Sequence, residues 1–173
     1  MKTLKTISLI LFVSLSLIAC KSDDDGGSDS QGGEGDFTAK VDGNSFEGLT
    51  GTVKAVITDN GAGQSLAVSG GTSESENLQM IIQGFDGEGT YQLNFTNIGT
   101  YSYLPDPNNP DPNTVVVFTT VGDAQSNNGE LKVSSFDGET IKGTFTFTGY
   151  NLDDNNDTVT VSDGAYNIKV SDQ

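Results

Sequence analysis

The chain has 173 residues and a formal net charge of −16 at pH 7, with 24 acidic residues, eight lysines, no histidine and one cysteine. The missing histidine excludes Ser-His-Asp and Cys-His catalysis and histidine metal sites. The acidic charge argues against a nucleic-acid partner, because affinity for nucleic acid comes mainly from cationic contacts to phosphate groups.

Residues 1–19 are predicted to be a signal peptide. A basic start is followed by an apolar run over 7–18, which is shorter than the roughly 20 apolar residues that span a bilayer. The run ends in Leu17-Ile18-Ala19-Cys20, which resembles the lipobox of bacterial lipoproteins. The resemblance implies cleavage between Ala19 and Cys20 and a diacylglycerol on the sulfur of Cys20, which would anchor the chain to a membrane. An ordinary signal peptide with a chance cysteine is the alternative.

Residues 20–36 are predicted to be a flexible tether. No apolar side chain lies between Lys21 and Gly35, so the segment cannot bury enough surface to offset the entropy of ordering it. An acidic cluster directly behind the cysteine resembles the surface-export signal of Bacteroidota lipoproteins. The candidate sorting residues are Lys21, Asp23, Asp24 and Asp25. We therefore expect the protein at the outer membrane, with its domain on the cell surface, although the acids could also serve only to solvate the tether.

Residues 37–173 are predicted to form one all-β domain. Asx-Gly pairs supply the positive φ values that tight hairpin turns need, and short runs rich in β-branched and aromatic residues lie between them. The pairs are Asp42-Gly43, Asn60-Gly61, Asp86-Gly87, Asn128-Gly129, Asp137-Gly138 and Asp163-Gly164. The predicted strands are 37–41, 51–58, 64–69, 78–85, 90–95, 100–104, 114–120, 131–136 and 140–150, with a closing hairpin of 159–161 and 166–170 around Asp163-Gly164.

The clearest predicted strand is 140–150. Ile141, Phe145 and Phe147 fall on one of its faces, and threonines and a lysine fall on the other, as in a half-buried antiparallel strand. About ten short strands with mostly hairpin links imply an antiparallel β-sandwich or a partly closed meander barrel. The sequence does not separate these two architectures.

Two stretches resemble uncharacterised Bacteroidota lipoproteins that carry a single all-β domain of unknown function. One is Phe37-Thr38-Ala39-Lys40-Val41-Asp42-Gly43, and the other is Gly143-Thr144-Phe145-Thr146-Phe147-Thr148-Gly149-Tyr150-Asn151 followed by Val159-Thr160-Val161-Ser162-Asp163-Gly164. The similarity covers most of 37–170. It implies the fold but supplies neither an activity nor catalytic residues.

Two acidic loops, 106–113 and 153–157, are candidate calcium sites, because calcium takes roughly six to eight oxygen ligands. Neither loop has the EF-hand spacing, and turn chemistry with solubility is the plainer explanation of both. Calcium is the one cofactor that the sequence suggests. The candidate ligands are Asp106, Asp111, Asp153, Asp154 and Asp157.

Tyr101, Tyr103 and Tyr150 lie beside these loops and are candidate ligand-binding residues, because aromatic rings stack on sugars. Ordinary packing or cross-strand pairing is the alternative. The absence of tryptophan, which offers the largest stacking face, weakens the sugar-binding case.

These features favour a non-catalytic surface module that binds a glycan, a peptide or an envelope protein through loops at one end of the domain. One alternative is a lipocalin-like small-molecule carrier with a cavity inside a barrel. The other is a glycoside hydrolase that uses two acidic residues, which are the catalytic equipment that this composition leaves. We expect no enzyme and therefore no catalytic residues.

Overall fold

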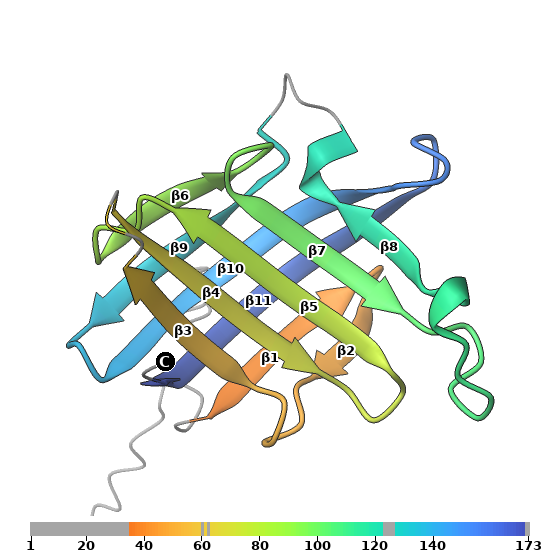
Figure 1. Cartoon of the computed structure of the whole chain (residues 1–173), viewed down its shortest axis with the longest axis horizontal. Helices are drawn as coiled ribbons and strands as arrows, with labels where there is room; N and C mark the ends of the chain where they lie inside the picture. Colours follow the sequence, from red (N-terminus) through yellow and green to blue (C-terminus); the bar gives the residue numbers. More distant parts are fainter. Residues whose placement is uncertain (1–34, 60, 62, 123–126, 172–173) are drawn as a thin grey trace, which may run out of the picture.

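The computed structural model of the chain describes residues 35–59, 61, 63–122 and 127–171 (Figure 1). The predicted signal peptide and the predicted lipidation and sorting residues, Cys20, Lys21, Asp23, Asp24 and Asp25, lie outside these residues. In the described part of the chain, no helix is long and apolar enough to cross a membrane.

The described residues form eleven strands and two short 3-10 helices, which confirms the all-β prediction. In chain order they are β1 (Asp36–Val41), β2 (Asn44–Glu47), β3 (Lys54–Asp59), β4 (Gln64–Gly71), β5 (Glu76–Gln83), β6 (Gly89–Leu93), β7 (Ile98–Tyr103), η1 (Pro112–Thr114), β8 (Val116–Thr119), η2 (Thr120–Gly122), β9 (Gly129–Phe136), β10 (Thr140–Asn151) and β11 (Thr158–Ser171).

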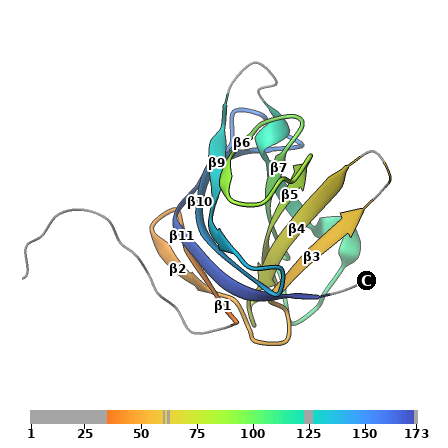
Figure 2. The ribbon, with the colours of Figure 1, turned by 90° about the vertical axis from the view of Figure 1, so that its left-hand side faces the viewer.

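All strands belong to one mostly antiparallel eleven-stranded sheet in the order β2-β1-β11-β3-β4-β5-β7-β8-β10-β9-β6, which also pairs β11 with β10. The sheet folds into two layers that face each other (Figure 2). The "β10 layer" is β2-β1-β11-β10-β9-β6, and the "β5 layer" is β3-β4-β5-β7-β8. Short pairings of β11 with β3 and of β8 with β10 join the layers at two corners. The fold is therefore a sandwich closed into a partial ring, and not a clean barrel.

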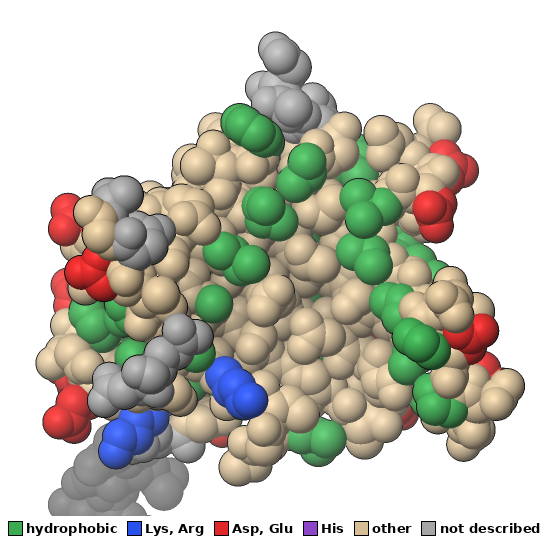
Figure 3. Space-filling view, in the orientation of Figure 1, with side chains coloured by type: hydrophobic (Ala, Val, Ile, Leu, Met, Phe, Trp, Pro, Cys, Tyr) green, Lys and Arg blue, Asp and Glu red, His purple; other side chains and the backbone are tan. Residues whose placement is uncertain are grey.

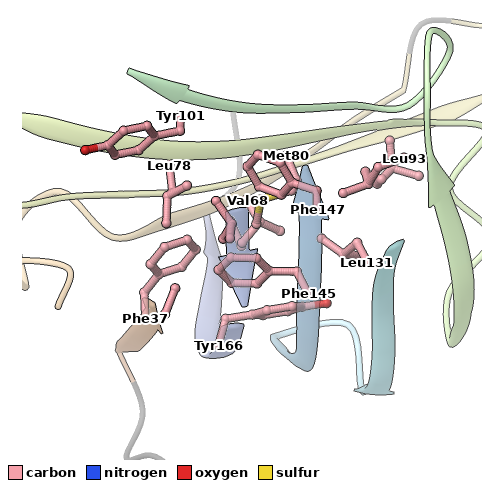
Figure 4. Close-up of a cluster of buried hydrophobic side chains, with 14 of the residues drawn as sticks. Phe37, Val68, Leu78, Met80, Leu93, Tyr101, Leu131, Phe145, Phe147 and Tyr166 are labelled. Atoms are coloured by element: carbon pink, nitrogen blue, oxygen red, sulfur yellow. The ribbon is translucent and has the colours of Figure 1, made fainter. Parts of the chain in front are cut away.

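The core lies between the two layers. Ile141, Phe145 and Phe147 of β10 point inward and are at most 2% exposed, as the alternation in the sequence predicted. They belong to one core cluster with inward-facing side chains of β4 and β5 from the other layer. Figure 4 shows Phe145 and Phe147 facing that layer. Each fully buried side chain of this size contributes about 1.5–3 kcal/mol. These facing side chains are Leu66, Val68, Leu78, Met80 and Ile82.

Glycines let aromatic rings cross neighbouring strands within the core. At Gly143 of β10, a Cβ atom would overlap both the carbonyl oxygen of Lys132 and the hydroxyl of Tyr166. The Tyr166 ring therefore reaches over Gly143, and its hydroxyl donates a hydrogen bond to the Lys132 carbonyl at 3.1 Å. Phe145 stacks on Phe37 at 5.2 Å between ring centroids, which links β10 to β1.

The outer face of the β5 layer carries few charges. Its outward positions include an apolar row, Val56, Ala67, Ile81 and Ile98, whose members lie opposite one another on β3, β4, β5 and β7. Acidic side chains gather around the rim of this face instead (Figure 3). On this face, acidic charge is thus concentrated at the rim.

The predicted closing hairpin is wrong. β11 runs without a turn from Thr158 to Ser171, and Asp163, with φ 50°, stands at a bulge where the pairing register with β1 and β10 shifts. Because β1 and β10 pair with β11 on both sides of this point, the extra residue is absorbed as a bulge and not as a turn.

The other Asx-Gly pairs divide between turns and other roles. Asp42-Gly43 and Asp137-Gly138 connect paired strands, β1 with β2 and β9 with β10, so these two hairpin turns are confirmed. Asp86-Gly87 joins β5 to β6, which pair with different strands, and Asn128-Gly129 leads into β9, so neither closes a hairpin. Asn60 lies outside the described residues. Strand β2 was not predicted.

Candidate functional site

A pocket of about 300 Å³ lies between the two layers, which we call the mouth pocket. The β1–β2 hairpin forms one wall, the adjoining ends of β5 and β7 form another, and the start of β11 completes it. Apolar side chains of the core margin line it: Val41, Phe46, Phe118 and Val159. Polar groups line the rest: Asp42, Asn44, Ser45, Glu76, Tyr101, Tyr103, Asp157 and Thr158.

Two tyrosines of β7 form the aromatic part of the mouth pocket. The rings of Tyr101 and Tyr103 lie 5.8 Å apart, and Tyr101 is also 6.2 Å from the ring of Phe118. Tyr101 is only 7% exposed, whereas Tyr103 is half-buried. Tyr101 therefore builds the pocket floor, and Tyr103 offers ring surface to a ligand.

Glu76 connects the tyrosines to the acidic lining. The Tyr101 hydroxyl donates to Glu76 Oε1 at 2.7 Å, and the Thr72 hydroxyl donates to Oε2 at 3.1 Å. Burial, followed by the hydrogen bond to Glu76 and its charge, raises the pKa of Tyr101 well above its usual value. Tyr101 therefore stays protonated at physiological pH and remains a fixed hydrogen-bond donor.

The two other carboxylates of the mouth pocket are also held by the protein. Asp42 Oδ1 accepts a hydrogen bond from the backbone N–H of Thr160 at 2.8 Å. Asp157 Oδ2 accepts one from the side-chain amide of Asn151 at 2.9 Å. The pocket thus presents charged groups whose positions are set before any ligand arrives.

A second pocket of about 340 Å³ adjoins the first and shares Ser45 and Glu76 with it. It lies between the segment after β2 and the β4–β5 turn, and it adds Glu47 and Glu74 to the acidic lining. The described residues that line the two pockets include no lysine.

A family model for a domain of unknown function, DUF6252, matches residues 34–168. The chain belongs to the DUF6252 family. No curated protein and no solved structure gave a match. The expected resemblance to a domain of unknown function is confirmed, and the DUF6252 description names no activity, ligand or cellular location.

The DUF6252 domain brings together residues that the sequence placed in two separate groups. Tyr101 and Tyr103 were candidate stacking residues and Asp157 a candidate calcium ligand, and all three line the mouth pocket. Tyr150 lies elsewhere on β10, where its Cβ and ring pack closely against Gly122 of η2. It does not line the mouth pocket.

Three of the four remaining candidate calcium ligands of the DUF6252 domain serve turns. Asp106 Oδ1 accepts from the backbone of Asn108 and Asn109, and Asp111 caps η1 by accepting from Asn113, which holds the pKa of Asp111 below its usual value. Asp154 likewise accepts from the backbone and side chain of Asn156, and Asp153 is exposed. Among the described residues, no three His, Cys, Asp or Glu side chains come together as a potential metal site. Calcium binding stays a prediction.

Sequence reasoning missed the residues that complete the mouth pocket, above all Glu76 and Asp42. Glu76 lies opposite Tyr103 because β5 pairs with β7 and not with the next strand along the chain, β6. No local pattern gives that pairing. Asp42 was seen only as a turn residue, although the turn that it forms also places its carboxylate at the pocket.

Proposed function

We propose that this chain is a membrane-anchored, non-catalytic binding module on the cell surface that takes a glycan, a peptide or a segment of an envelope protein into the mouth pocket. The observation that carries the proposal is the pocket itself. It combines a partly exposed ring, Tyr103, with oriented hydrogen-bonding groups at the open end of a well-packed fold. Anchoring rests on the lipobox-like sequence before Cys20 and outward sorting on the acidic cluster behind it.

The packed interior favours such a module over a lipocalin-like carrier. A carrier holds its ligand between the layers, and in this domain that space contains side chains such as Met80, Phe145 and Phe147, each at most 2% exposed.

Binding can be tested with the soluble form of the mature chain on glycan and peptide arrays. We compare the wild type with Tyr103→Ala, which removes the exposed ring of the pocket, and with Phe95→Ala, which removes a ring that is 63% exposed and does not line the pocket. The affinity for each ligand found on the arrays should fall about tenfold or more in Tyr103→Ala, as for an aromatic hot spot. In Phe95→Ala the affinity should be unchanged. Hits that are equally strong in all three proteins would show that the ligand binds elsewhere, and an absence of hits on both arrays would contradict the proposal.

A further inference from the structure

We propose that the mouth pocket selects an organic cation, namely the primary amine or guanidinium group of a basic peptide side chain or of a polyamine. The inference rests on the proposed function, because it names the chemistry of the ligand that this pocket takes. It begins from the charges of the lining, where Asp42, Glu76 and Asp157 stand without a lysine beside them. Asp42 and Asp157 are exposed and Glu76 is partly buried, so the lining carries a negative field that repels an anionic ligand and attracts a cationic one.

The carboxylates keep hydrogen-bonding capacity for a ligand. Within the described residues, the hydrogen bonds of Asp42 use Oδ1 and those of Asp157 use Oδ2, so the second oxygen of each carboxylate has no protein partner. An ammonium or guanidinium group carries several N–H donors and no acceptor, and it is therefore matched to such oxygens. Charge-assisted hydrogen bonds of this kind are roughly twice as strong as neutral ones.

The ring of Tyr103 supplies a second contact that favours a cation. Tyr103 lies directly opposite Glu76 in the β5–β7 pairing, on the inward face that also carries Tyr101. A cation that bonds Glu76 can therefore lie against the exposed part of the Tyr103 ring, where the electron-rich face attracts it. A neutral sugar would use the ring but not the charges.

The spacing of the carboxylates favours an extended organic cation over a metal ion. A calcium ion needs several oxygen ligands about 2.3–2.6 Å from one point. The described acidic residues form no group of three that could converge on a metal, although two more carboxylates, Glu47 and Glu74, continue from the mouth pocket into the adjoining one. A ligand with several amines spaced along a chain matches charges that are spread over both pockets.

The test is isothermal titration of the soluble mature chain with four probes: capped tetralysine, the same peptide with its amines acetylated, spermidine and calcium chloride. Tetralysine or spermidine should bind, and its affinity should fall with added salt. The acetylated peptide should not bind, and calcium should not compete with tetralysine for the mouth pocket. If spermidine binds as tightly as tetralysine, the source of the amine is a free polyamine. If tetralysine binds much more tightly, the source is a basic peptide.

Two variants with the same change in charge locate the site. Glu76→Gln keeps a hydrogen-bond acceptor for Tyr101. It should lower the affinity for tetralysine by about fivefold, as expected for the loss of one partly exposed ion pair. Glu130→Gln alters an exposed carboxylate on β9 that lines neither pocket, and it should leave the affinity for tetralysine within twofold. If both variants lose the same affinity for tetralysine, the effect comes from net charge alone, and the inference is overturned.

The outcomes separate the inference from the proposed function. A neutral glycan that binds in a Tyr103-dependent way while tetralysine and spermidine do not would overturn the cation preference and leave the binding module standing. Binding of calcium in competition with tetralysine would overturn it in favour of a metal. No binding by any probe or array ligand would overturn both.

Discussion

Replacing Gly143 with alanine is expected to destabilise the domain strongly although it adds a single methyl group. The new Cβ would overlap the Lys132 carbonyl oxygen and the Tyr166 hydroxyl, so β9 and the Tyr166 ring must both move. Overpacking of this kind costs about 1–3 kcal/mol, and losing the hydrogen bond from Tyr166 to Lys132 costs about 1 kcal/mol more. The free energy of unfolding should therefore fall by about 2–4 kcal/mol, compared with a total of roughly 5–15 kcal/mol for a typical domain.

Urea unfolding followed by tyrosine fluorescence measures this loss, since the chain has no tryptophan. Gly89→Ala is the matched control, because a Cβ at Gly89 meets only Tyr91 at 3.9 Å, and it should be neutral or stabilise by about 0.4–1 kcal/mol. Tyr166→Phe removes the hydrogen bond without the overlap and should cost about 1 kcal/mol. Equal midpoints for Gly143→Ala and Gly89→Ala would refute the close approach of the Tyr166 ring to β10.

Three further changes have defined outcomes. Tyr101→Phe removes the 2.7 Å hydrogen bond to Glu76. Because water can replace the lost hydrogen bond on the exposed side of Glu76, the free energy of unfolding measured in urea should fall by only about 1–2 kcal/mol. Asp137 accepts hydrogen bonds from the backbone of Thr140 and Glu139, which hold its pKa below its usual value in the folded state. Its contribution to stability is thus present at neutral pH and is lost as the pH falls through the lowered folded-state pKa, so the gap in stability between wild type and Asp137→Ala should narrow in acid. A gap that is constant with pH would contradict this assignment. Cys20→Ala should move the protein from the membrane fraction to the soluble fraction and remove a lipid-modified N-terminus from its mass spectrum, and a variant that still sediments with membranes would rule out the anchor.

Local sequence patterns predicted most of the strands because alternation and turn chemistry are local properties. The predicted strand 140–150 appears as Thr140–Asn151, with Phe145 and Phe147 buried as expected. The failure at Asp163-Gly164 has the same origin. A positive φ at Asp163 suits both a turn and a bulge, and the choice between them depends on β1 and β10 pairing alongside.

Pairings between distant segments could not be predicted, and they build both the fold and the site. β11 pairs with β1 from the other end of the domain, and its last residues pair in parallel with β3. The mouth pocket likewise joins the β1–β2 turn, the β5–β7 pair and the start of β11. The sequence supplied candidate side chains such as Tyr103 and Asp157, but their meeting with Glu76 depends on a strand order that no local signal encodes.

The position of the mouth pocket explains why binding and stability should respond to different residues. The corners that close the ring, β11 with β3 and β8 with β10, tie the layers together by backbone hydrogen bonds. The pocket lies instead where the β1–β2 hairpin faces the β5–β7 pair. Tyr101 is buried there and supports the packing, but Tyr103 is half-buried and loses less contact when it is truncated. Tyr103→Ala should therefore cost less in unfolding free energy than Tyr101→Ala and still weaken ligand binding, so that a loss of binding in the Tyr103 variant reports on the pocket and not on a failure to fold.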